Sequence, residues 1–489
     1  MPSNPILRRE VLKAGCGGAL AASYVFAPAG LRAQARATVA EDMARWIVAL
    51  RYEQLPANVV ASAKRVLFDT LGCALGGINA APVRMAAEVV ALQGGNPQAT
   101  AIGLGRKVSC DQAAFLNGMA LRYLDYNDYA ALGRPHHPSI NVAPALAVAE
   151  MQKLSGKDLL LGIVTGYEVQ VRLRDAIGGR GREGWDGTSI TAQYSTAAAA
   201  GKLLGLDAAK LANALAIAGS NANTLAEVRR GEELTPAKGS AEPIAARNGT
   251  FAALLARAGL SYPLSIIEGE GGYAKMVAGP LNEEVLRRRS GDFEILKSSI
   301  KLWPSVGTAQ APIAAASEIY RQRPPAAEIA AITIALSDFA YGQQQPMPKE
   351  INTREHADHS VRYLVARALL DGNVTVDDFA QNRFRDPRAL ALIERMVLRS
   401  EPSLPDNALG ANIEARLASG QVLRANVPIP PGDMRNPADD ANLAKKFLAL
   451  SEKVLGPERA QRAVGIIRSV ETMTDLAALL GAVAVQNAR

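Results

Sequence analysis

Apolar residues recur at three- and four-residue spacing from residue 38 to about residue 260. Gly or Pro separates one run from the next, which is the pattern of successive helices. The clearest runs are 57–71, 81–92, 110–124, 143–154, 157–177 and 192–204. Several runs, such as 197–201, consist of Ala and Gly, whose small size lets helices approach closely. This part of the sequence predicts a compact bundle with many buried helices.

The pattern changes near Gly291, where strand-like alternation appears. Residues 332–336 alternate as a strand, and 413–417 and 422–427 flank a turn at 418–421. The last two segments predict a β-hairpin with one solvent-exposed face. Helical runs at 361–370 and 387–396 lie between these strands, so the region is predicted to be α+β.

Helical periodicity returns at 441–455 and at 460–485, and we expect these segments to rejoin the first bundle. The fold class is therefore predicted to be mainly α. A discontinuous helical domain of residues 36–292 and 441–489 would carry an inserted α+β lid of residues 293–440. A cleft between two domains is a common location for a ligand.

The N-terminus has the features of an export signal. Arg8-Arg9 is followed by a short apolar run at 14–29 and by the A-x-A sequence Ala33-Gln34-Ala35. We predict a twin-arginine signal peptide over residues 1–35 and a periplasmic protein. The apolar run is too short and too rich in Gly and Ala to span a bilayer, so no membrane attachment is expected after cleavage.

Composition narrows the function classes. The formal net charge of +7 falls to about +4 without residues 1–35, which is too small and too dispersed to indicate nucleic-acid binding. Cys73 and Cys110, the cysteines that follow the signal, have no CxxC or Cys/His spacing, so no zinc site is predicted. Cys73 is expected to be buried, and one disulfide between the two stays open. The chain has no dinucleotide fingerprint, P-loop, G-x-S-x-G or H-E-x-x-H.

Only four histidines occur in 489 residues, and they form two pairs: His136 with His137, and His356 with His359. Each pair lies beside carboxylates in a polar segment without a regular period. Histidine titrates nearest neutrality and is suited to proton transfer. The clustering favours an active site over two solvated loops.

Four polar segments offer groups for proton abstraction next to a carboxylate. They contain a carboxylate, imidazole, ammonium and phenol set: Asp125, Asp128, His137, Lys238, Lys301, His359 and Tyr363. A carbanion α to a carboxylate needs a base and cationic stabilisation. Structural alternatives stay open. Asp125 would be a surface acid at a helix end, Lys238 a helix-end charge and Lys301 a strand-edge charge.

The same segments resemble a known family. The matching motifs are 68–77 (FDTLGCALGG), 124–128 with 137–139, 166–169, 199–206, 247–249, 268–272, 353–363 and 368–372. Together they are similar to the MmgE/PrpD family, and most of all to its 2-methylcitrate dehydratase branch. The resemblance extends over nearly the whole chain after the signal.

The resemblance implies a homodimeric lyase or isomerase that acts on small polycarboxylates without a metal or cofactor. Asp125, His137, Lys238, Lys301 and Tyr363 match active-site positions of the family. His137 would move the proton at carbon with Asp125 positioning it, and Lys238 and Lys301 would neutralise substrate carboxylates. His359 and Tyr363 would shape the lid side, and Asp128 and Thr308 would complete the substrate-binding set.

The chain departs from the dehydratase pattern at three places. Tyr129-Ala130 replaces Thr-Trp, Ile140 replaces an acidic residue, and Thr308 replaces a histidine. We predict a dehydratase that abstracts a proton α to a carboxylate and expels water from a hydroxy-polycarboxylate. The alternatives are a decarboxylase or epimerase of the family, and a non-catalytic periplasmic carboxylate-binding protein, which Thr308 favours.

Overall fold

A computed structural model describes residues 36–130, 136–178, 181–229, 234–288, 291–407 and 409–485. The predicted signal peptide over residues 1–35 lies outside them. The described residues from Thr38 onward belong to one compact unit. This unit contains all helices and strands of the described residues, and the fold is mainly α, as predicted.

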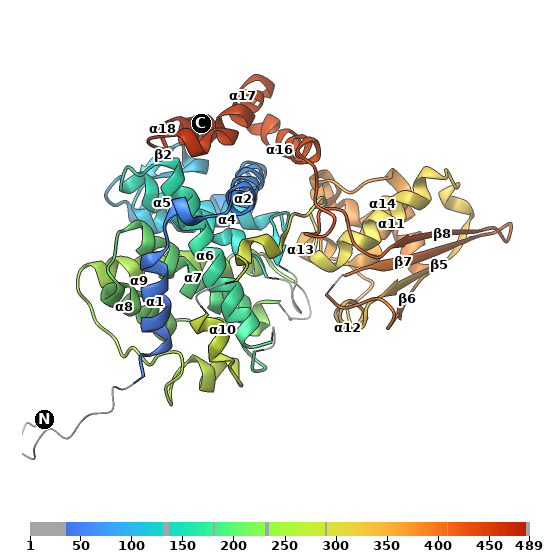
Figure 1. Cartoon of the computed structure of the whole chain (residues 1–489). Coiled ribbons are helices and arrows are strands. Elements are labelled where there is room, and N and C mark those ends of the chain that lie inside the picture. Colours follow the sequence, from blue (N-terminus) through green and yellow to red (C-terminus); the bar gives the residue numbers. More distant parts are fainter. Residues whose placement is uncertain are drawn as a thin grey trace, which may run out of the picture. The chain divides into compact units, whose positions relative to one another are not determined.

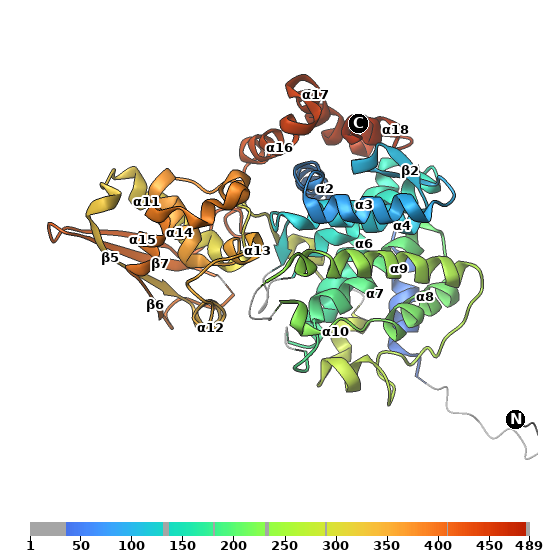
Figure 2. The same ribbon diagram turned by 180° about the vertical axis from the view of Figure 1, so that it is seen from behind.

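The first helices pack into one core (Figures 1 and 2), and the six that lie between residues 57 and 203 match the predicted apolar runs. The first helices are α1 (Val39–Ala49), α2 (Ala57–Gly77), α3 (Ala81–Gln93), α4 (Cys110–Tyr123), α5 (Val142–Met151), α6 (Gly156–Ala176), α7 (Gly187–Leu203), α8 (Ala208–Ser220), α9 (Ala241–Arg257) and α10 (Glu283–Arg287). Two short antiparallel pairs accompany them, β1 (Ala99–Ala101) with β2 (Arg106–Val108), and β3 (Tyr129–Ala130) with β4 (Ser298–Ser299).

Small residues allow the close packing that the sequence predicts. Gly249 of α9 lies against α7, where a Cβ would stand 2.1 Å from Thr196 Oγ1 and 2.6 Å from the carbonyl oxygen of Gln193. Any larger residue at 249 would force these helices apart, since real Cβ contacts are longer.

A four-stranded sheet in the order β6-β5-β7-β8 forms the α+β part. Its elements are α11 (Gln310–Arg321), β5 (Ile329–Leu336), α12 (Asp338–Gln344), α13 (Arg354–Ala357), α14 (Val361–Asp371), α15 (Pro387–Glu394), β6 (Met396–Ser400), β7 (Ala411–Leu417) and β8 (Val422–Val427). Strand β5 pairs parallel with β6 and antiparallel with β7. The predicted hairpin is confirmed as β7–β8, in antiparallel register from Ala411↔Val427 to Arg416↔Val422. Helix α11 packs on the sheet (Figure 1).

The C-terminal helices return to the first bundle, as predicted. They are α16 (Asp440–Leu455), α17 (Pro457–Arg468) and α18 (Ala477–Val483), and α16 lies beside α2 (Figures 1 and 2). The rings of Phe447 and Phe68 lie 4.7 Å apart at this contact.

Two separate hydrophobic clusters underlie this arrangement. One holds Val39 to Ile300 together with Ala438 to Val483, and the other holds Ala309 to Val427. On this basis we propose a helical domain and an α+β domain, as the sequence predicts. Ile295 and Ile300, which the prediction assigns to the lid, pack in the cluster of the helical domain.

Cys73 and Cys110 are both buried, free thiols. Burial raises the pKa of each thiol to about 12. In the described part of the chain, no single helix is both long and apolar enough to cross a membrane. Only α2 and α3 taken together meet that length and composition, and they are bent by 88° at their junction.

Candidate active site

The chain turns sharply where α4 ends, and this turn positions Asp125. Leu124 is the C-cap of α4, and Asp125 adopts a left-handed conformation with φ of 50°. A positive φ is uncommon for a residue with a side chain and is found most often at sites that the surroundings hold in place. The chain then enters β3, whose pairing with β4 brings Lys301 close to Asp125.

Three cations surround the buried carboxylate of Asp125. Its Oδ1 accepts from Arg122 Nη1 at 2.8 Å and from Lys301 Nζ at 2.6 Å, and its Oδ2 lies 3.2 Å from Lys238 Nζ. Burial alone would raise the pKa of Asp125, but Arg122, Lys301 and Lys238 outweigh it and hold this pKa well below its ordinary value. Asp125 is therefore an anion, and the surface-acid alternative is wrong because its side chain is buried.

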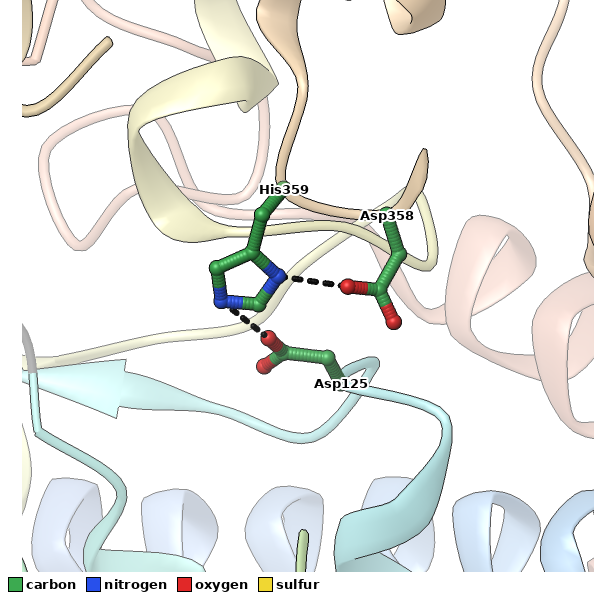
Figure 3. Close-up of side chains that lie close together, drawn as sticks. All are labelled: Asp125, Asp358 and His359. Atoms are coloured by element: carbon green, nitrogen blue, oxygen red, sulfur yellow. Dashed lines mark hydrogen bonds and ion pairs between the residues drawn. The ribbon is translucent and has the colours of Figure 1, made fainter. Parts of the chain in front are cut away.

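The second carboxylate of the site belongs to Asp358, in the α+β part of the chain. Asp358, the C-cap of α13, accepts from Lys238 Nζ at 2.7 Å and from Arg354 Nη1 at 3.0 Å. His359 lies between the two carboxylates in Figure 3, with Nδ1 2.5 Å from Asp358 Oδ1 and Nε2 3.4 Å from Asp125 Oδ2. Its side chain is 20% exposed, against 2% or less for Asp125, Asp358 and Lys238, so solvent reaches the cluster at His359.

Asp125, Asp358 and His359 also have the spacing of a metal site, because their ligand atoms lie within 4.8 Å of one another. The Nζ of Lys238 lies 2.7 Å from Asp358 Oδ1 and 3.2 Å from Asp125 Oδ2, and it is also 2.8 Å from His359 Nδ1. The ammonium of Lys238 thus stands where a cation would be coordinated and supplies the positive charge that the two carboxylates require. This residue set does not fit a metal ion while Lys238 is in place.

His137 is held in one tautomer by the segment that precedes it. Its Nδ1 lies 2.9 Å from the backbone oxygen of Asp128. A carbonyl oxygen only accepts, so Nδ1 carries the hydrogen and Nε2 keeps its lone pair. Burial, followed by the charges of Arg122 and Lys301, lowers the pKa of His137 well below its ordinary value, against the opposing charge of Asp125. A neutral imidazole whose Nε2 keeps its lone pair is suited to act as a base.

The side chain of Asp128 supports this segment. Its Oδ1 accepts from the backbone N–H of Ser139 at 3.1 Å and its Oδ2 from the hydroxyl of Tyr167 at 2.7 Å. Both oxygens are thus used inside the protein, so the geometry points to a structural role for Asp128. Burial raises the pKa of Asp128 to about 6 despite these hydrogen bonds.

Five of the predicted site residues, together with Arg122 and Asp358, share this region: Asp125, His137, Lys238, Lys301 and His359. Lys238 and Lys301 are buried in it, so their readings as a helix-end charge and a strand-edge charge are wrong.

Tyr363 and Thr308 are placed differently. The hydroxyl of Tyr363 donates to the backbone oxygen of Asp378, and its ring packs near that of Phe379 in the second hydrophobic cluster. Thr308 lies in the short helix η8 (Gly307–Ala309), where its buried hydroxyl has no hydrogen-bond partner among the described residues. Neither residue is joined to the cluster by a contact in the described part of the chain, and their predicted roles stay predictions.

The sequence did not single out Arg122 or its partner Glu242. Arg122 lies in α4 and donates through Nε to Glu242 of α9 at 2.6 Å, which leaves Nη1 directed at Asp125. A charged residue inside a run of buried helical positions was the available signal, because such a residue is almost never buried without a partner.

Family models match most of the chain. The MmgE/PrpD N-terminal domain matches residues 41–284, and the MmgE/PrpD C-terminal domain matches residues 303–472. The chain belongs to the MmgE/PrpD family. The predicted family is thereby confirmed. The first match ends and the second begins near Gly291, where the sequence changes from helical periodicity to strand-like alternation.

Several characterised members of the family align over most of this chain. A cis-aconitate decarboxylase-like protein of Aspergillus oryzae is 27% identical over 469 residues, which cover 90% of this chain and 96% of that protein. Human cis-aconitate decarboxylase is 28% identical over 468 residues, 90% of this chain and 94% of its own. The 2-methylcitrate dehydratase of Cupriavidus necator is 28% identical over 436 residues, 81% of this chain and 88% of its own. These relatives are lyases, and the chain is accordingly an enzyme of the lyase class.

Proposed function

We propose that this MmgE/PrpD enzyme is a dehydratase of a small hydroxy-polycarboxylate. The observation that carries the proposal is the hydrogen bond from His137 Nδ1 to the backbone oxygen of Asp128, which keeps the lone pair on Nε2, together with the charges of Lys301 and Asp125 that act on the same imidazole. Proton abstraction α to a carboxylate needs this pairing of an unprotonated base with fixed cations that stabilise the developing enolate.

In the proposed reaction, Nε2 of His137 removes a proton from the carbon α to a substrate carboxylate. The electron pair of the broken C–H bond first forms an enolate with the adjacent carboxylate, and it then forms the C=C bond as the C–O bond of the β-hydroxyl breaks. The hydroxyl leaves as water with a proton from the Lys238–His359 pair, which then recovers a proton from solvent, while the proton taken by His137 returns to solvent. Lys301 and Lys238 stabilise the anionic intermediate.

Decarboxylation is the second candidate. Relatives named cis-aconitate decarboxylase match 90% of this chain, and Thr308 stands where the dehydratase pattern has a histidine. A decarboxylase must deliver a proton to the carbon that loses carbon dioxide, so it needs a protonated acid there. The lowered pKa of His137 supports a base in the unliganded enzyme and therefore favours dehydration.

Incubation in heavy water separates these reactions. The mature protein is mixed with 2-methylcitrate or cis-aconitate, and proton and carbon NMR follow the products. Formation of an alkene from 2-methylcitrate supports the dehydratase. Release of carbon dioxide from cis-aconitate assigns the decarboxylase, and deuterium uptake without net product assigns an epimerase. Thermal stabilisation with no exchange would leave the protein a carboxylate binder and refute catalysis.

We propose that the reaction needs no metal or cofactor, because the ammonium of Lys238 neutralises the carboxylates that would otherwise coordinate a cation. Dialysis against a chelator should leave turnover unchanged, and its loss with recovery on adding a divalent ion would refute the proposal.

We also propose twin-arginine export to the periplasm, which rests on Arg8-Arg9 and the cleavage sequence at 33–35. Cell fractionation of the full chain should recover the shortened protein from the periplasm. Replacement of both arginines by lysine should retain it in the cytoplasm, and unchanged localisation would contradict the proposal.

A further inference from the structure

Lys446 of helix α16 binds the backbone of two segments that carry active-site residues. Lys446 is buried, and its Nζ donates to the backbone oxygen of Tyr126 at 2.7 Å and to that of Lys301 at 2.9 Å. It also forms an ion pair with Asp69 of α2, with 2.6 Å between Nζ and Oδ1. An ammonium has three hydrogens, so these three oxygens account for all of its donors.

The two backbone segments that Lys446 joins are the ones that carry the central ion pair. Tyr126 follows Asp125 directly, and Lys301 is the residue whose side chain meets Asp125. The Nζ of Lys446 also lies 3.9 Å from the ring centroid of Tyr126, and the hydroxyl of Tyr126 donates to the backbone oxygen of Leu302 at 2.7 Å. Lys446 and Tyr126 thus join the same two segments at two successive positions.

This connection is useful because Asp125 has an uncommon backbone conformation. A residue with a φ of 50° keeps that geometry only when its surroundings fix it. The short β3–β4 pair offers two residues of register on each side, which leaves the segment from 125 to 126 to be held by other contacts.

Helix α16 is itself placed firmly enough to position Lys446. The next residue, Phe447, packs on α2, where a Cβ at Gly72 would lie 3.0 Å from Phe447 Cδ2. Asp439 accepts from the backbone N–H of Asn442 and caps the start of the helix. The helix therefore meets α2 at close range and directs Lys446 toward Asp69.

We propose that Lys446 is a positioning residue of the active site: by binding the carbonyl oxygens of Tyr126 and Lys301, it sets the separation of Asp125 and Lys301. This inference rests on the proposed function for its kinetic consequence, whereas its geometric consequence can be measured without turnover. Without Lys446 the two segments would separate, and Lys301 would move away from Asp125 and from the surroundings of His137.

The charges that face His137 make this displacement measurable. They are Arg122 of α4, Lys301 after β4, and Asp125, while the backbone of Asp128 binds Nδ1. Withdrawal of Lys301 removes one of the two cations that disfavour protonation of His137. The imidazole should therefore titrate at higher pH when Lys446 is lost.

The test compares Lys446→Met with Lys453→Met, a change of the same kind two turns further along α16. Lys453 is exposed and pairs with Asp377. In the full chain labelled with ¹³C-histidine, the pH titration of His137 is followed by NMR, and kcat is measured on whichever probe, 2-methylcitrate or cis-aconitate, the wild type converts. Lys446→Met should shift the titration of His137 upward and lower kcat by about 10²-fold, the cost of a 1 Å misplacement. Lys453→Met should change neither.

An unshifted titration in folded Lys446→Met protein would overturn the positioning role, whatever the kinetics. A shifted titration in a protein whose wild type converts neither probe would instead leave the positioning role standing and count against the proposed function. If Lys446→Met does not fold, Tyr126→Phe carries the test, because it keeps Lys446 and removes only the hydrogen bond to Leu302. It should give a smaller upward shift in the titration of His137, and the absence of any shift would overturn the inference.

Discussion

Replacement of His137 by Asn distinguishes the roles of the two ring nitrogens of His137. The side-chain amide of Asn can still donate to the backbone oxygen of Asp128, which His137 Nδ1 contacts at 2.9 Å. It cannot replace Nε2, which we propose as the base. The substitution therefore keeps the local hydrogen bond and removes the proton acceptor. It also spares the charged cluster, since Lys238 and Lys301 both contact Asp125 directly.

The expected loss follows from the contribution of a positioned base. General acid–base groups contribute about 10²- to 10⁴-fold to the rate, or about 3–5 kcal/mol of transition-state stabilisation. The imidazole that contacts Asp125 in the described part of the chain is that of His359, whose Nε2 is 3.4 Å from Oδ2. We expect kcat of His137→Asn to fall by about 10³-fold, with a smaller change in KM because the lysines remain. Deuterium exchange and product formation are read in the same NMR time course.

Tyr363→Phe is the matched control, since the sequence predicted both residues to be catalytic and the structure connects only His137 with the charged region. Loss of the hydroxyl that donates to the backbone oxygen of Asp378 should lower the free energy of unfolding by about 1 kcal/mol and leave kcat unchanged. Full activity of His137→Asn in a protein with unchanged near-ultraviolet circular dichroism would refute the role of His137. A large fall in kcat of Tyr363→Phe would restore Tyr363 to the mechanism.

Three further predictions concern pH and assembly. A general base must be unprotonated, and the pKa of His137 lies well below 6.5. We therefore expect kcat/KM to stay level as the pH falls to 6.5 and to decline only below that pH. A decline centred at or above pH 6.5 would exclude His137 as the titrating base. The pKa of Asp128 is about 6 in the folded protein and 3.8 ordinarily, so its contribution to the free energy of unfolding is fully present below pH 3.8 and is lost as the pH rises through 6. The loss amounts to up to about 3 kcal/mol. Urea titrations should show this decrease in the wild type and not in Asp128→Asn. Three apolar side chains of α3 are exposed on one face, since they are spaced by four and three residues: Met85, Val89 and Leu92. We propose that this face forms part of a homodimer contact. Light scattering should find wild-type dimers and Leu92→Glu monomers, and a monomeric wild type would refute the proposal.

Elements with a clear period could be predicted from the sequence. Strict alternation on both sides of 418–421 predicted the β7–β8 hairpin, and three- and four-residue spacing predicted α4 and α6 to within one residue of their ends. The predicted helix over 460–485 was wrong, because the chain breaks after Arg468 and resumes at Ala477. Both parts have apolar residues on one face, so periodicity alone does not reveal the break.

The active site could be predicted only as far as its residues stand out in polar segments. Asp125, His137 and His359 did so, whereas Arg122 and Lys446 lie inside helical runs in which a basic residue ordinarily faces solvent. Lys446 contacts the backbone oxygen of a residue 320 positions away. Backbone acceptors leave no trace in the sequence, so this connection becomes visible only in three dimensions.

The structure of the protein with 2-methylcitrate or cis-aconitate bound tests the central claim most directly. One substrate carboxylate is predicted within hydrogen-bond distance of the Nζ atoms of Lys238 and Lys301, with the α-carbon facing Nε2 of His137. A substrate bound away from these lysines, or one whose α-carbon is out of reach of His137, would contradict the assignment of this cluster as the catalytic centre.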